Sequence, residues 1–130
     1  MTVGLAANPV ANSMLDLFGS ASQSGWSNVW VQLHEADPGA AGTTSVSTET
    51  TRKAVTFAAA SSGSKAANGT LPSWPTWSAG TETITHLSLW TASTSGTFLG
   101  SITLTQGKTV NDNDTLNITA ITLSISTLAA

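Results

Sequence analysis

Residues 29–39 read VWVQLHEADPG, and residues 84–90 read ITHLSLW. In both stretches apolar and polar side chains alternate, which is typical of a β-strand that buries one face. The first stretch ends in Asp37-Pro38-Gly39, three residue types that favour a turn. The two stretches together predict a packed β protein with polar turns between its strands.

The remaining chain adds shorter strands with turn signals between them. We expect strands at Val55 and Phe57, from Phe98 to Thr105 after a turn at residues 94–96, and over residues 116–125 after a turn at residues 111–114. The spacing predicts a mainly β fold, an antiparallel β-sandwich of jelly-roll or Ig-like form. The residues predicted to form its core are Val29, Val31, Leu33, Phe57, Leu87, Leu89, Ile102, Leu104, Ile118 and Leu123.

One helix is expected near the N-terminus. Asn8 is a suitable N-cap, Pro9 suits the first helical position, and Gly19 would end the helix. Apolar residues recur inside it at helical spacing and would pack on a sheet or on another subunit. The candidate partner-binding residues of this helix are Val10, Met14, Leu17 and Phe18.

The length of 130 residues predicts a single domain over residues 1–130. Within it we expect an N-terminal arm and helix over residues 1–20 and the β-sandwich over residues 28–127. Residues 40–51 are small and polar without periodicity, which predicts a long exposed loop or arm. Long loops of this kind tend to contact partners.

Composition excludes several classes of function. Charged residues make up 8% of the chain, the net charge is −3, and the four basic residues are scattered, so nucleic acid is not an expected partner. No apolar run is long enough to cross a membrane. The chain has no cysteine, and its 40 Ser and Thr residues favour strands over helices.

Two acidic segments are candidate metal sites. His34, Glu35 and Asp37, with His86, could ligate a metal ion, but their spacing fits no known pattern and capping of a turn is the favoured reading. The same holds for Asp112 and Asp114. No serine lies in a G-x-S-x-G motif, and we expect no enzymatic activity. We also expect no bound metal ion and no cofactor.

The five tryptophans are unusual in a chain without tyrosine. Trp74 and Trp77 lie among Pro, Ser and Thr, as Trp26 lies among Ser and Gly. If exposed, these indoles could stack on a sugar ring or anchor an interface. The alternative is that they cover the ends of the core, and the sequence leaves both readings open.

Several segments in this order carry a resemblance to a family. They are residues 11–16 (ANSMLD), 29–39 (VWVQLHEADPG), 52–57 (RKAVTF), 84–90 (ITHLSLW), 107–110 (GKTV) and 114–116 (DTL). The chain resembles the small virion proteins of tailed bacteriophages, which are head decoration or minor capsid proteins, or tail-fibre-like proteins.

The resemblance implies a structural protein of the virion, made in the host bacterial cytoplasm and carrying no catalytic residues. We expect it to decorate and stabilise the capsid, with the major capsid protein and its own copies, as a homotrimer, for partners. The alternative is a tail-fibre or tail-tip module that binds a host surface glycan through Trp74 and Trp77.

Overall fold

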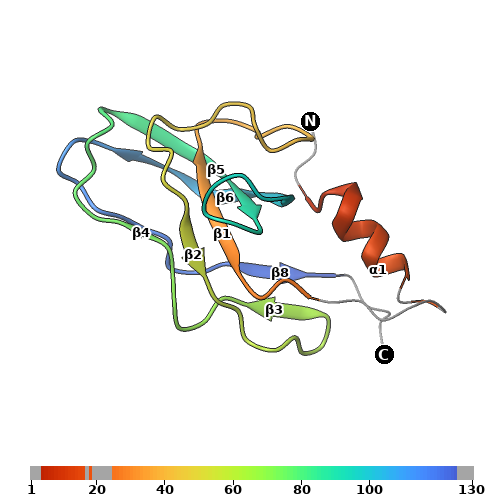
Figure 1. Ribbon diagram of the computed structural model, residues 1–130. Helices are drawn as coiled ribbons and strands as arrows, with labels where there is room; N and C mark the ends of the chain where they lie inside the picture. Colours follow the sequence, from red (N-terminus) through yellow and green to blue (C-terminus); the bar gives the residue numbers. More distant parts are fainter. Residues whose placement is uncertain (1–3, 17, 19–24, 126–130) are drawn as a thin grey trace.

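A computed structural model describes residues 4–16, 18 and 25–125 of the chain (Figure 1). The fold is mainly β with antiparallel strand pairs, as predicted. Its elements are a π-helical turn (Ala7–Ala11), α1 (Asn12–Asp16), β1 (Val29–His34), β2 (Lys53–Val55), β3 (Ser64–Ala66), β4 (Ser73–Trp74), β5 (Glu82–Trp90), β6 (Phe98–Val110), β7 (Leu116–Asn117) and β8 (Thr122–Ser124).

The largest sheet has four strands in the order β2-β1-β5-β6. Val31 lies opposite Leu89 and Leu33 opposite Leu87, so one face of the sheet is apolar. The other face carries His34 opposite His86. The alternation read from residues 29–34 and 84–90 therefore has the predicted phase.

Two further sheets have two strands each, β3 with β8 and β4 with β7. Leu116 of β7, with Ile118 and Ile121 that follow it, belongs to the same buried core as the large sheet. These elements cover part of the apolar face. The description of the whole as a sandwich, and its jelly-roll or Ig-like form, stays a prediction.

The N-terminal helix begins earlier than the sequence suggested. Ala6, not Asn8, is the N-cap, and no side chain caps the helix there. The first turn is wound wide, with the Ala11 N–H donating to the Ala6 carbonyl at 3.1 Å. Pro9 did not fix the start, because as the third residue of this turn it lacks an N–H that would have no partner inside the helix in any case. The predicted stop, Gly19, lies outside the described residues.

The predicted core is half confirmed. Val31, Leu33, Leu87, Leu89 and Ile118 are buried. The other predicted core residues pack against the core but stay partly exposed; they are Val29, Phe57, Ile102, Leu104 and Leu123. The apolar face of the sheet is thus wider than the described part of the chain that covers it.

Residues 40–51 form a largely exposed loop, as predicted, but it is not a free arm. The carboxylate of Glu82, a residue that is only 7% exposed, accepts hydrogen bonds from the Ser47 hydroxyl at 2.5 Å and the Thr48 N–H at 2.8 Å. The Ser47 N–H also donates to the Leu33 carbonyl at 3.0 Å. The loop is therefore fixed to β1 and β5.

Among the residues that the structure describes, no helix has the length and apolarity needed to cross a membrane.

Candidate binding groove

An apolar groove runs along the part of the large sheet that the described residues leave uncovered. It consists of two adjoining cavities of about 570 Å³ and about 470 Å³ that share five lining residues: Leu5, Val10, Lys65, Leu89 and Leu123. The walls come from the N-terminal segment, the large sheet, and the β3–β8 pair. The volumes fall in the range of protein binding sites.

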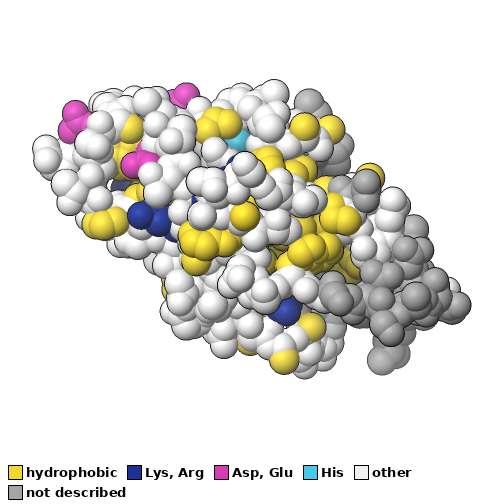
Figure 2. Space-filling model, in the orientation of Figure 1, with side chains coloured by type: hydrophobic (Ala, Val, Ile, Leu, Met, Phe, Trp, Pro, Cys, Tyr) yellow, Lys and Arg dark blue, Asp and Glu magenta, His cyan; other side chains and the backbone are white. Residues whose placement is uncertain are grey.

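The sheet supplies the floor of the groove, and exposed apolar side chains form its rim. Leu89 of β5 and Leu99 of β6 are nearly buried beneath it. Leu5, Trp26 and Ile125 lie along it with 48%, 40% and 56% of their surfaces exposed. Figure 2 shows apolar side chains gathered in a hollow on this face. An exposed apolar surface of this kind is typical of an interaction site.

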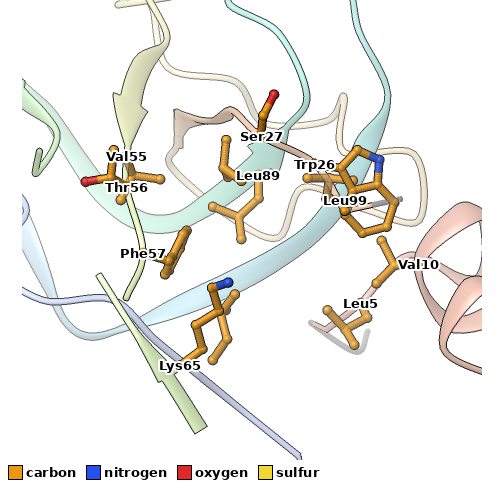
Figure 3. Close-up of a pocket in the computed structure, with 13 residues that line it drawn as sticks. Leu5, Val10, Trp26, Ser27, Val55, Thr56, Phe57, Lys65, Leu89 and Leu99 are labelled. Carbon is orange, nitrogen blue, oxygen red and sulfur yellow. The ribbon is translucent and has the colours of Figure 1, made fainter. Parts of the chain in front are cut away.

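Lys65 is the one charged residue among the described residues that line the two cavities. It projects from β3, and Figure 3 shows its side chain reaching toward the middle of the groove between Phe57 and Leu89. Its aliphatic stem extends the apolar wall, and its ammonium group places a positive charge inside it.

Gly100 helps to shape the groove. It lies opposite Leu89 in the β5–β6 pair and forms a bridge with Leu5 on its other side. A Cβ atom at this position would lie 2.6 Å from the Gly4 carbonyl oxygen. Glycine is therefore required for the N-terminal segment to lie along β6 and form one wall.

The residues predicted to bind a partner are only partly brought together. Val10 and Met14 line the groove, although Val10 is itself only 6% exposed. Phe18 is 86% exposed and does not line it. Leu17 lies outside the described residues.

Trp74 and Trp77 are in the core, which is the second of the two readings that the sequence left open. Their exposed fractions are 2% and 1%. The Trp74 indole N–H donates to the Thr51 carbonyl at 2.8 Å, and the Trp77 indole N–H donates to the Gly80 carbonyl at 2.8 Å. Internal acceptors satisfy both indoles, which is why rings from a Pro- and Ser-rich segment can be buried. Neither ring offers a face on which a sugar could stack.

The polar face of the large sheet holds a second cluster. The imidazole of His34 is fully buried, with Nδ1 2.8 Å from the Thr44 carbonyl and Nε2 2.7 Å from the Ser88 hydroxyl. The Trp90 indole N–H donates to the same hydroxyl at 2.7 Å. Because a carbonyl only accepts, Nδ1 carries the proton and Nε2 accepts from Ser88.

The buried position of His34 governs its ionisation. Burial lowers the pKa of His34, against the opposing effect of its hydrogen bond to the Thr44 backbone. The nearby charges of His86 and Arg52 lower it further. Ser88 is also fully buried, so this Ser–His pair has no access to a substrate and serves to join the 40–51 loop to the sheet.

The acidic side chains near the turns serve as caps. Asp37 accepts from the Gly39 N–H at 2.7 Å, and Asp112 accepts from the Gly80 N–H at 2.8 Å. Asp114 accepts from the Asn111 N–H at 2.9 Å. Within the described part of the chain, no three His, Asp or Glu side chains are grouped so that they could hold a metal ion.

Comparison with known proteins gives the family. Residues 6–126 match the family described as podophage GP4 fiber I protein gp80. The chain belongs to this family. It is therefore a bacteriophage structural protein of a tail-fibre-like family, which is one of the kinds that the resemblance named, and the family implies a place on the virion. No curated protein matches the chain.

Sequence reasoning did not single out Lys65 or the groove's exposed rim. One signal was available, because Lys65 is the only charged residue between Lys53 and Glu82. The surplus of predicted core residues was the second signal, because Val29, Phe57, Ile102 and Leu123 all line the groove.

Proposed function

We propose that this protein is a structural subunit of a phage fibre and attaches to its neighbours in the virion through the apolar groove. The family, whose description names a fiber protein, supports the fibre over decoration of the capsid. The groove supports attachment, because burial of its exposed side chains by another protein is favourable at about 25 cal/mol per Å² of apolar surface.

The proposed role is non-enzymatic. A structural fibre subunit needs an adhesive surface and a rigid body. The cluster formed by His34, Ser88 and Trp90 supplies rigidity by fixing the 40–51 loop to the sheet. The glycan-binding alternative loses its proposed residues, since Trp74 and Trp77 are buried. The predicted homotrimer and the predicted contact with the major capsid protein stay predictions.

Copy number in purified virions tests the proposal. Mass spectrometry with labelled peptide standards would give the number of copies of this protein relative to the major capsid protein. Electron microscopy with gold-labelled antibodies against this protein would then show where on the virion it lies. A small number of copies located at the tail is expected. Copies in proportion to the capsid lattice, with gold over the shell, would show decoration instead.

A further inference from the structure

We propose that the groove takes an apolar segment of a different virion protein, and that an acidic side chain of this segment pairs with Lys65. The inference rests on the proposed function and names the kind of partner that the groove fits.

The lining of the groove sets the first requirement. Apart from Lys65, the side chains that face it are apolar or uncharged, and they come from the N-terminal segment, β1, β2, β3, β5, β6 and β8. Apolar side chains of a partner would replace water over Leu89, Leu99 and Leu123. Burial of these side chains is favourable only if the partner segment brings few polar groups of its own.

Lys65 sets the second requirement. Covering the groove would remove water from its ammonium group, and no carboxylate lines either described cavity to compensate. Leaving a charge desolvated and unpaired is strongly unfavourable. A partner with a carboxylate at this point offsets that cost, so Lys65 selects an acidic residue and fixes the register of the segment.

A second copy of the chain that faces the groove about a two-fold axis fits poorly. Two grooves facing each other about a two-fold axis would present the same surface twice, which brings two Lys65 ammonium groups into one apolar interface. Five of the carboxylates in the described part of the chain are already engaged within it. Those that already accept hydrogen bonds from the chain itself are Asp37, Glu49, Glu82, Asp112 and Asp114.

Charge reversal in the phage provides the test. Lys65→Glu would place a carboxylate against the partner's carboxylate, and the amount of the protein in purified particles should fall by about tenfold or more. Lys108→Glu is the matched control. It makes the same change on β6 at an exposed lysine that does not line the groove, and incorporation should stay at the wild-type level.

Purified Lys65→Glu protein should keep the thermal midpoint of the wild type, because Lys65 is exposed. Loss of incorporation then reports docking and not folding. The separate variant Lys65→Arg keeps the positive charge, and its incorporation into particles should stay at the wild-type level.

Second-site suppressors of Lys65→Glu identify the occupant. The proposal expects a change of Asp or Glu to Lys or Arg, flanked by apolar residues, in another virion protein. Suppressors confined to this chain would show that a second copy fills the groove, and normal incorporation of Lys65→Glu would show that no acidic partner does. Either outcome overturns the proposal. The proposed function has its own test. It would fail if wild-type protein were not found at the tail, whatever the behaviour of Lys65→Glu.

Discussion

Removing the charge of Glu82 should release the 40–51 loop from the sheet. Glu82→Gln keeps the size of the side chain, but its amide has only one acceptor oxygen. It can keep the bond from the Thr48 N–H as a neutral one, whereas the bond with the Ser47 hydroxyl must reverse, with the amide N–H donating to that hydroxyl. Charged hydrogen bonds contribute about 1.5–3 kcal/mol and neutral ones about 0.5–1.5 kcal/mol, so the two together should lose about 2–3 kcal/mol of unfolding free energy. For a chain of this length that corresponds to about 6–12 °C in thermal midpoint.

The assay combines calorimetry with amide hydrogen exchange. The Thr48 amide should exchange faster in Glu82→Gln, because its acceptor is weakened. Glu49→Gln is the matched control: its carboxylate, on the same loop, accepts from the Thr51 N–H at 2.8 Å in an exposed setting. Its midpoint should move little. Equal midpoints for the two variants, with unchanged exchange at Thr48, would refute the idea that Glu82 fixes the loop.

Three further predictions concern the sheet. Because the pKa of His34 is lowered in the folded state, the unfolded chain binds a proton at pH values where the folded chain does not. The free energy of unfolding should therefore fall as the pH drops below about 6.5, the ordinary pKa of a histidine. Chemical denaturation from pH 7.5 to 5 measures this slope, which His34→Gln should flatten; an unchanged slope in this variant would contradict the assignment. Leu89→Ala should cost about 2–3 kcal/mol in urea denaturation, the lower part of the usual range, because the groove already opens beside it; no loss would contradict the assigned strand phase. Gly100→Ala should displace the segment at Gly4, seen as faster exchange of the Ser101 amide, and unchanged exchange would contradict the close approach.

The strands were the most predictable part of the fold. Alternation over residues 29–33 and 87–89 predicts which side chains share a face, and the cross-strand pairs Val31–Leu89 and Leu33–Leu87 follow it. The turn at residues 94–96 also forms as expected, since Ser95 and Gly96 both adopt positive φ.

Burial of the tryptophans was not predictable from local sequence. Trp74 and Trp77 lie in a segment with the composition of an exposed loop, and the acceptor of the Trp74 indole, the Thr51 carbonyl, is 23 residues away in the sequence. Tethering of the 40–51 loop is equally non-local, since Ser47 and Glu82 are 35 residues apart.

The groove exists because part of the apolar face of the large sheet is not covered by other described residues. Alternation marks Val29, Phe57 and Ile102 as inward-facing, but it says nothing about whether another layer reaches them. Here the helix and the β3–β8 pair leave a gap in which these side chains stay partly exposed. Surplus inward-facing residues are therefore a sequence signal for an interface as much as for a core.

A cryo-electron microscopy reconstruction of the intact virion at side-chain resolution tests the central claim most directly. The predicted result is that the chain lies in a fibre, with an apolar segment of another virion protein in the groove and a carboxylate against Lys65. A chain located on the capsid shell, or a groove in the assembled fibre that is open to solvent, would contradict it.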